Sequence, residues 1–513
     1  MFDGFLRVAA ATPDIRVADC NFNGASAAAL VSEAYEQGVS LLVLPELCLT
    51  GYTCSDLFLQ ESLLDGAGKA LLTLTEATRD KNMVVLAGLP LTVNGVLYNV
   101  AAVLHDGDIL GFVPKSYLPT YSEFYEGRHY HSGADIEADV LFNGRTYPFG
   151  TRLLFRCRQM PAFTLGIEIC EDLWVAQPPS ISHALAGATV IANLSASDET
   201  TGKDIYRRSL VSGQSARLVC GYIYADAGEG ESSTDLVFGA HNLICENGSI
   251  LAESERFSNQ MIMADMDMSK LISERRRMTT WQPKFDNGYR VIDFDLEMHE
   301  VDLRRFIDPH PFVPDDAMDR TRRCEEILTI QAMGLKKRLA HTHCRHAVVG
   351  ISGGLDSTLA LLVTVRAFDM LDMDRSQIMA VTMPCFGTTD RTYHNACELV
   401  RRLGATLEEV DIKEAVTLHF SDIGQDPANH DVTYENGQAR ERTQVLMDIA
   451  NRLGGMVIGT GDMSELALGW ATYNGDHMSM YGVNASVPKT LVRHLVRYCA
   501  DTADSQTLKE TLL

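Results

Sequence analysis

Apolar and polar positions alternate along the first 260 residues in a way that predicts short strands and a helix. Apolar residues recur at helical spacing over 27–37, which indicates a helix. Two apolar runs, 96–104 and 109–113, flank His105-Asp106-Gly107-Asp108, and this turn predicts a β-hairpin. Further apolar runs predict strands over 41–44, 83–86, 163–169 and 189–191. This mixture favours an α+β or layered α/β domain.

The pattern changes between residues 266 and 319. A charged run, "ERRR" at 274–277, is followed by the helix-breaking "WQP" at 281–283, and three prolines crowd into "FIDPHPFVPDD". This composition is typical of a connecting arm. We therefore expect a first domain over 1–265, a connector over 266–319 and a second domain over 320–513.

Regular α/β alternation returns in the last 200 residues or so. The spacing predicts helices over 321–341, 357–368, 392–403 and 438–452. Apolar runs between them predict strands over 347–351, 378–383, 407–410 and 456–460. Strands that alternate with helices in this order predict a doubly wound parallel sheet.

Composition narrows the class of protein. A chain of 513 residues is too long for one hydrophobic core, and 46% hydrophobic with 22% charged residues is ordinary for a globular protein. The formal net charge of −24 disfavours a nucleic-acid partner. No apolar run is long enough to predict a membrane span, and the N-terminal residues do not resemble a secretory signal.

The twelve cysteines favour a reducing, cytoplasmic location. They are scattered and contain no C-x-x-C pair. The segment "HTHCRH" at 341–346 suggests a metal site at first sight, but it abuts a strand and lacks a second group of ligands. We therefore expect most of the cysteines to be buried thiols.

A glycine turn, "SGGLDS" at 352–357, directly follows a predicted strand. In a doubly wound sheet, ligands bind beyond the carboxyl ends of the strands. Gly353 and Gly354 let backbone N–H groups approach an anion, and the next helix offers its positive N-terminus. The turn has neither the Gly-Lys-Ser/Thr ending of the common nucleoside-triphosphatase loop nor a G-x-G-x-x-G fingerprint. It is predicted to hold phosphate.

Asp356 lies inside this turn, where a carboxylate repels phosphate unless a cation lies between them. We interpret Asp356 as a ligand of Mg²⁺ that bridges to pyrophosphate. Spacing alone leaves open an ordinary helix N-cap formed by Ser352 or Asp356.

The pattern S-G-G-x-D-S after a strand resembles the pyrophosphate-binding loop of the ATP pyrophosphatases. Three later segments resemble those of the NAD synthetases: "YENGQARERTQVLM" (434–447), "GTGDMSELALGWATYNGD" (459–476) and "VPKT" (487–490). The resemblance implies an adenine nucleotide hydrolase-like fold, ATP as co-substrate, Mg²⁺ as cofactor and deamido-NAD as substrate.

This resemblance also implies residue roles. ATP and pyrophosphate would contact Ser352, Gly353, Gly354, Asp356, Ser357 and Thr460. Deamido-NAD would contact Tyr434, Asn436, Arg440, Asp476 and Lys489, and Mg²⁺ would be held by Asp356 and Glu465. Many family members have a lysine where this chain has Tyr473, so its contact must be absent or supplied elsewhere. Taken singly, Asp462 and Glu465 could equally be acids in a first helical turn, and Lys489 a solvated surface lysine.

Three polar residues follow apolar strands in the first half: Glu46 in "LLVLPELCLTGY", Lys115 in "GFVPKSYLP" and Cys170 in "FTLGIEICEDLW". Strand ends can bring such side chains together at one edge of a sheet. A thiol nucleophile, a carboxylate base and a cation near the oxyanion suit amide hydrolysis. Singly, Glu46 and Lys115 could be loop charges and Cys170 a buried thiol.

These segments resemble the nitrilase, or carbon–nitrogen hydrolase, superfamily over residues 4–265. The resemblance implies an αββα sandwich with Glu46, Lys115 and Cys170 as a catalytic triad. It also places Tyr52, Tyr121 and Glu126 near a glutamine pocket, with Ser197 and either Lys203 or Arg207 facing the amino-acid head group.

The order of amidase, connector and synthetase resembles that of the glutamine-dependent NAD synthetases. It implies conversion of glutamine, ATP and deamido-NAD to glutamate, NAD, AMP and pyrophosphate, with ammonia passing internally, in a homo-oligomer. The rival reading is a nitrilase-family amidase whose second domain only binds nucleotide as a regulator. Family members usually continue well beyond the position of Leu513, so the sequence leaves open a C-terminal truncation.

Overall fold

The apolar runs of the first half form two sheets in the unit Met1–Phe306. The structure is a computed structural model that describes residues 4–284, 288–314, 317–386 and 390–512. The strands of the first sheet are β1 Phe5–Ala11, β2 Leu41–Val43, β3 Val84–Val93, β4 Val96–His105, β5 Asp108–Pro114, β6 Glu137–Phe142, β7 Arg145–Gly150 and β14 Met261–Asp267. Their order in the sheet is β14-β1-β2-β3-β4-β5-β7-β6.

The second sheet of this unit lies against the first. Its strands are β8 Leu153–Cys157, β9 Thr164–Ile169, β10 Val190–Ser195, β11 Gly221–Asp226, β12 Leu243–Glu246, β13 Ser249–Glu253 and β15 Arg290–Phe294. Their order is β13-β12-β11-β10-β9-β8-β15. Strands β9, β10 and β11 pair in parallel, so their carboxyl ends meet at one edge.

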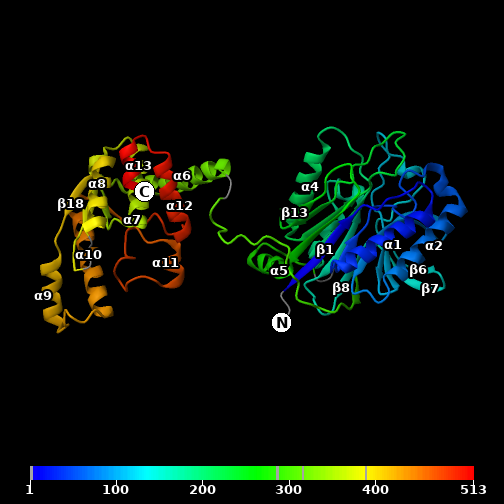
Figure 1. Ribbon diagram of the computed structural model, residues 1–513, viewed down its shortest axis with the longest axis horizontal. Coiled ribbons are helices and arrows are strands. Elements are labelled where there is room, and N and C mark those ends of the chain that lie inside the picture. The colour runs from blue at the N-terminus through cyan, green and yellow to red at the C-terminus, as the bar shows by residue number, and fades with distance from the viewer. Residues whose placement is uncertain (1–3, 285–287, 315–316, 387–389, 513) are drawn as a thin grey trace. The chain divides into compact units, whose positions relative to one another are not determined.

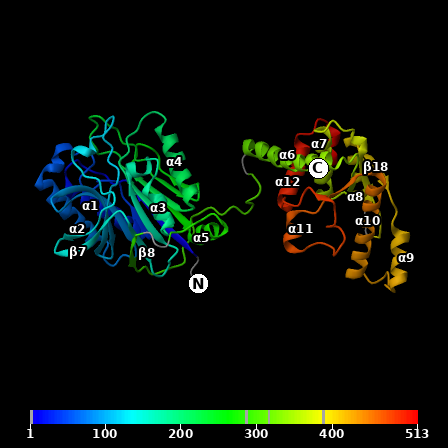
Figure 2. The ribbon, with the colours of Figure 1, turned by 180° about the vertical axis from the view of Figure 1, so that it is seen from behind.

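Helices cover the outer face of each sheet (Figures 1 and 2). Helices α1 (Cys20–Glu36) and α2 (Glu61–Ala77) share one buried cluster with the first sheet. Between the sheets, side chains such as Val8, Phe155 and Ile167 form a second cluster. Helices α3 (Pro179–Leu185) and α4 (Lys203–Leu218) pack on the second sheet. The predicted αββα sandwich is therefore confirmed.

Part of the segment expected as a connector is folded into this unit. Strand β14, which ends at Asp267, pairs with β1, and β15 pairs in parallel with β8. Helix α5 (Met268–Arg277) lies between these strands in sequence, and its Met268 and Leu271 are buried in the cluster between the sheets. The compact unit consequently extends to Phe306, because these apolar side chains complete its core.

The unit Ile307–Leu513 contains one parallel sheet. Its strands are β16 Ala347–Gly350, β17 Ile378–Thr382, β18 Thr406–Glu409, β19 Met456–Gly459 and β20 Tyr481–Gly482. Their order is β18-β17-β16-β19-β20. The helices are α6 Ala317–Thr342, α7 Leu355–Asp369, α8 Asp390–Leu403, α9 Lys413–Ile423, α10 Val432–Leu453, α11 Met463–Leu468, α12 Lys489–Asp501 and α13 Gln506–Leu512.

Helices bury both faces of this sheet. Residues of α6, α7, α8 and α12 share one apolar cluster with one face, and residues of α9 and α10 share another with the opposite face. This arrangement confirms the predicted doubly wound sheet. Across the described parts of both units, no helix combines the length and apolar character needed to cross a membrane.

Candidate active sites in the two units

Glu46 lies in the turn that follows β2, and Gly88 of β3 makes room for that turn. A Cβ on residue 88 would lie 2.2 Å from the backbone nitrogen of Leu47, so only glycine fits. Glu46 is buried, and its carboxylate is fixed on both oxygens. Oε1 accepts from Asn99 Nδ2 at 2.6 Å and from Lys115 Nζ at 2.7 Å, and Oε2 accepts from Ala196 N at 3.0 Å.

Lys115 follows β5 and is buried between two carboxylates. Its Nζ donates to Glu46 Oε1 at 2.7 Å and to Glu126 Oε1 at 2.6 Å. Burial alone would lower the pKa of Lys115, but the charges of Glu126 and Glu46 hold it well above its usual value. Burial raises the pKa of Glu126 to about 7 although Lys115 opposes this effect. Lys115 therefore stays charged at neutral pH.

Cys170 begins the short turn Cys170–Leu173 directly after β9. Its φ of 43° is a left-handed conformation that is unusual for a non-glycine residue. Its backbone N–H donates to Asn193 Oδ1 at 3.1 Å. Burial raises the pKa of the Cys170 thiol well above its usual value; the charge of Glu46 adds to this, and that of Lys115 opposes it. The predicted trio of Glu46, Lys115 and Cys170 is thus close enough to interact electrostatically.

Asp172, which the sequence analysis did not single out, connects two members of this trio. Its Oδ1 accepts from the backbone N–H groups of Ser116 at 3.1 Å and Tyr117 at 2.8 Å. Its Oδ2 accepts from Ile169 N at 3.0 Å. The carboxylate therefore ties the chain after Lys115 to the turn that carries Cys170. In the sequence, Asp172 resembles any acid near a turn, so only its three-dimensional contacts identify it.

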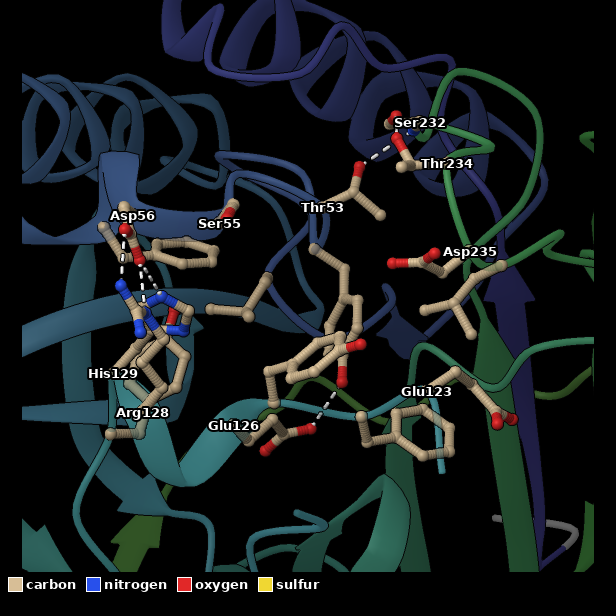
Figure 3. Close-up of a pocket in the computed structure, with 17 residues that line it drawn as sticks. Thr53, Ser55, Asp56, Glu123, Glu126, Arg128, His129, Ser232, Thr234 and Asp235 are labelled. Carbon is tan, nitrogen blue, oxygen red and sulfur yellow. Dashed lines mark hydrogen bonds and ion pairs between the residues drawn. The ribbon is translucent and has the colours of Figure 1, made fainter. Parts of the chain in front are cut away.

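A cavity of about 460 Å³ reaches the carboxylate of Glu126 (Figure 3). Its lining includes Tyr52, Phe124 and Leu236, with the acids Glu123 and Asp235. The Tyr52 hydroxyl donates to Glu126 Oε1 at 2.8 Å, which links the cavity wall to the buried lysine. Among the described residues, Glu126 Oε2 has no hydrogen-bond partner. This oxygen is also buried, so water does not reach it in this structure.

The other residues assigned to the glutamine pocket lie in different settings. The exposed Tyr121 donates its hydroxyl to Glu171 Oε1 at 2.9 Å. Ser197 is buried, and its N–H donates to Asp226 Oδ1 at 2.8 Å. Lys203 pairs with Asp198, and its ammonium lies 5.4 Å from the centre of the Trp174 ring.

Arg207, the alternative to Lys203, has its guanidinium fully buried among internal partners. It bonds to Glu199, to His241 Nδ1 at 2.9 Å and to Ser197 Oγ at 3.2 Å. Of the two cations considered for the head group, only Lys203 keeps part of its side chain exposed.

In the second unit, the glycine turn joins β16 to α7 as its sequence predicts. Gly353 has a φ of 79°, which favours glycine, and Gly354 N donates to Ser352 Oγ at 3.3 Å. Ser357 Oγ donates to Gly354 O at 3.0 Å. Asn484 Nδ2 donates to both Asp356 O at 2.9 Å and Thr460 O at 3.1 Å. Asn484, which the sequence analysis missed, thereby ties the turn to the end of β19.

Three carboxylates converge beside this turn. Asp356, Asp462 and Glu465 each offer an oxygen, and these oxygens lie within 4.8 Å of one another. Lys489 Nζ lies among them, 2.7 Å from Asp356 Oδ2, 2.8 Å from Asp462 Oδ2 and 3.1 Å from Glu465 Oε1. The carboxylates keep the pKa of Lys489 above its usual range, although burial acts in the opposite direction.

The residues assigned to deamido-NAD lie around α10 and the segment after α11. Tyr434 stacks on His430, with ring centres 4.3 Å apart. Arg440 Nε donates to the carbonyl of Tyr473 at 3.2 Å, which brings a cation to the segment that lacks the lysine. Asn436 is half-buried on α10, and Asp476 is exposed, its N–H donating to Thr472 Oγ1 at 3.0 Å.

Comparison with known proteins assigns each of the two units to a family. The family model for carbon-nitrogen hydrolase matches residues 7–276, and the model for NAD synthase matches residues 327–504. The glutamine-dependent NAD(+) synthetase of Mycobacterium tuberculosis is 45% identical over 510 residues, which cover 96% of this chain and 75% of that protein. The Mycobacterium leprae enzyme is 44% identical with the same coverage, and the Thermotoga maritima enzyme is 28% identical over 99% of this chain and 83% of its own length. The chain therefore belongs to the family of glutamine-dependent NAD(+) synthetases.

Proposed function

We propose that the unit Met1–Phe306 hydrolyses glutamine to glutamate and ammonia. The unit Ile307–Leu513 would use the ammonia to amidate adenylated deamido-NAD, with release of AMP and pyrophosphate. The observation that carries the proposal is the buried ammonium of Lys115, which is held between Glu46 and Glu126 and whose charge acts on the thiol of Cys170.

In this proposal Cys170 is the nucleophile, Glu46 the general base and Lys115 the oxyanion donor. The thiol is protonated at rest, because burial raises its pKa. As sulfur attacks the carboxamide carbon, the thiol proton passes to Glu46, and the charged Lys115 stabilises the negative oxygen. Glu46 then returns the proton to the leaving nitrogen, and ammonia departs from a thioester. Water attacks the thioester carbon while Glu46 takes a proton from it, the carbon–sulfur bond breaks, and Glu46 returns the proton to sulfur, which releases glutamate and restores the thiol.

The cavity beside Glu126 is proposed to hold glutamine. Its volume of about 460 Å³ lies in the usual range for small-ligand pockets. Tyr52, Tyr121 and Glu126 would shape the end near the reacting amide, and Ser197 with Lys203 would face the head group. Lys203 supports this role better than Arg207 does, because the guanidinium of Arg207 is fully buried.

The glycine turn is proposed to hold the phosphates of ATP through Ser352, Gly353, Gly354, Ser357 and Thr460. The adjacent acids fit Mg²⁺, since it prefers carboxylate oxygens and Asp356 Oδ1 is buried without a hydrogen-bond partner among the described residues. We propose Asp356, Glu465 and also Asp462 as ligands. When bound, the ion would neutralise the negative charge of the phosphates. Lys489 is proposed to hold these acids together and to contact phosphate or deamido-NAD.

Deamido-NAD is proposed to bind near Tyr434, Asn436, Arg440 and Asp476. Tyr434 offers an aromatic face, and Arg440 supplies a cation close to Tyr473. This contact of Arg440 supports the idea that it replaces the lysine that many relatives carry.

A homo-oligomer and a cytoplasmic location also belong to the proposal. Leu466, Leu468 and Trp470 are 56%, 78% and 81% exposed, and large exposed apolar groups of this kind are typical of interfaces. All twelve cysteines are free thiols, which suits a reducing compartment. Light scattering of the purified chain would measure its mass in solution, and a monomer would contradict the oligomer.

The test is NAD formation from deamido-NAD and ATP, with glutamine or ammonium, in wild type and Cys170→Ala. We expect the variant to lose synthesis with glutamine and to keep it with ammonium. Cys245→Ala, which alters a buried thiol of β12, is the matched control and should keep both. Glutamine hydrolysis by the wild type without any AMP production would instead favour an amidase with a regulatory nucleotide domain.

A further inference from the structure

Two loops of the first unit meet at the cavity, and the carboxylate of Glu231 joins them. Its Oε1 accepts from the backbone N–H of Tyr52 at 2.6 Å. Its Oε2 accepts from Thr53 N at 3.0 Å and from Thr53 Oγ1 at 2.5 Å. In return, Ser232 N donates to Thr53 Oγ1 at 2.8 Å, a contact that Figure 3 shows at the edge of the cavity. Both loops contribute cavity-lining residues.

These contacts hold Tyr52 at both ends. Its backbone N–H is fixed by Glu231, and its hydroxyl donates to Glu126 Oε1 at 2.8 Å. The same oxygen of Glu126 accepts from Lys115 Nζ at 2.6 Å. A continuous series of hydrogen bonds and covalent links therefore runs from Glu231 through Tyr52 and Glu126 to Lys115.

The loops themselves leave little freedom for another arrangement. Gly51, directly before Tyr52, has a φ of 85°, and Gly230, directly before Glu231, has a φ of 113°. A Cβ on residue 230 would lie 2.4 Å from the carbonyl oxygen of Ile15. Both turns are thus specified by glycine, and they direct the carboxylate of Glu231 and the N–H groups of Tyr52 and Thr53 toward each other.

We propose that Glu231 is a positioning residue for glutamine hydrolysis: it fixes the Tyr52 loop so that the Tyr52 hydroxyl stays on Glu126. The inference rests on the proposed function of this site. A carboxylate can accept all three donors at once, whereas an amide offers one oxygen and sets its NH₂ against a backbone N–H. Glu231→Gln should therefore loosen the loop without removing any group of the catalytic trio.

If Glu231 only held the two loops together, Glu231→Gln would lower the stability of the protein and leave catalysis unchanged. The pH dependence of glutamine hydrolysis therefore distinguishes a purely structural role from a positioning role. The Tyr52 hydroxyl favours the charged form of Glu126, and loss of that hydrogen bond raises the pH at which Glu126 becomes ionised. The ionised Glu126 anchors Lys115. The titratable groups that interact with the carboxylate of Glu126 through charge or a hydrogen bond are Lys115, Glu46, Tyr52, Cys170, Glu171 and Tyr130. None of these is altered in Glu231→Gln.

The experiment measures glutamate release as a function of pH for wild type, Glu231→Gln, Tyr52→Phe and the double variant. We expect Glu231→Gln to raise the KM for glutamine about tenfold, as loss of a hydrogen bond to a charged group does, and to move the acid limb of kcat/KM to higher pH. Tyr52→Phe should move the limb in the same direction. The double variant should move it no further than Tyr52→Phe alone, because both changes act through one hydrogen bond.

Glu229→Gln, an exposed acid on the same loop, is the matched control and should leave the profile unchanged. Ammonium-driven NAD formation should stay the same in all variants. If Glu231→Gln does not fold, Thr53→Val, which removes only the hydroxyl, should give a smaller shift in the same direction. The inference would be overturned if Glu231→Gln and Glu229→Gln gave the same pH profile of kcat/KM. It would also be overturned if the shifts of the acid limb in the two single variants added in the double variant. A wild type that does not hydrolyse glutamine would instead overturn the proposed function.

Discussion

The buried ammonium of Lys115 offers the sharpest test of the first site. Lys115→Met keeps much of the length of the side chain and removes its charge. The Lys115 and Glu46 side chains are 0% exposed and that of Glu126 is 4% exposed, so solvent cannot replace the lost cation. Two carboxylates that both accepted from Nζ, at 2.7 Å and 2.6 Å, are then left together in a dry site.

The loss of unfolding free energy in Lys115→Met should be large and should depend on pH. Removing one partner of a buried ion pair costs about 3–5 kcal/mol of unfolding free energy. Glu126 already has its pKa raised to about 7, and removal of the cation raises it further. A carboxyl with a folded-state pKa above its unfolded value costs stability that grows as pH rises between the two values. In the wild type, the pKa of Lys115 is held well above its usual value, so its contribution is complete at both pH 5.5 and pH 8. The deficit of the variant should therefore be smaller at pH 5.5 than at pH 8.

The assay is urea unfolding of the wild type, Lys115→Met and the control Lys69→Met, an exposed lysine of α2, at about pH 5.5 and about pH 8. Glutamate release should fall about 10²–10³-fold in Lys115→Met, since an oxyanion donor is lost. NAD formation with ammonium should not change. An unfolding free energy equal to that of Lys69→Met at pH 8, or the same deficit at both pH values, would refute the reasoning.

Four further changes test other contacts. Asp172→Asn sets an amide NH₂ against a backbone N–H. We expect thermal unfolding to show that the free energy of unfolding falls by about 1–3 kcal/mol, and glutamate release to be at least about tenfold slower. Gly88→Ala forces the turn that contains Glu46 to shift. The free energy of unfolding should therefore fall by about 1–3 kcal/mol, and the rate of glutamine hydrolysis should fall as well. Asp356→Ala should stop AMP release with either nitrogen donor while glutamate is still formed. Lys489→Met leaves three close acids without their internal cation, so Mg²⁺ should raise the unfolding temperature of this variant more than that of the wild type.

The polar residues at the ends of buried strands could be predicted from the sequence, because a buried strand appears in the sequence as a run of apolar residues. Strands β2 and β9 are mostly apolar and are buried on both faces, so the sequence places Glu46 and Cys170 at their ends. The hairpin of β4 and β5 was likewise predicted, and it carries Lys115. The three central strands of the second unit, β17, β16 and β19, were predicted for the same reason, since they are short apolar runs between helices.

Contacts between distant segments left no such signal. Glu46 accepts from Asn99, 53 positions away, and from Ala196 N, 150 positions away. Neither donor follows from periodicity, because each depends on how strands pair and how the sheets pack. The expected connector is similar: "ERRR" looks solvated in sequence, yet Arg275 is buried and its guanidinium donates to the carbonyls of Ala188, Leu218 and Val219.

Asp462 can serve both as a cap of α11 and as a group that faces a cation. As the N-cap of α11, it accepts from Glu465 N at 2.9 Å through Oδ1, while Glu465 Oε2 accepts from Asp462 N at 3.2 Å. Its Oδ2 meanwhile faces Lys489 at 2.8 Å. The cap uses one carboxylate oxygen of each acid and leaves the other free for a cation, so the start of α11 also fixes two of the three oxygens that converge beside the glycine turn. A sequence reveals the cap through its spacing, but it reveals the shared cation only once Asp356 and Lys489 are folded against the same helix end.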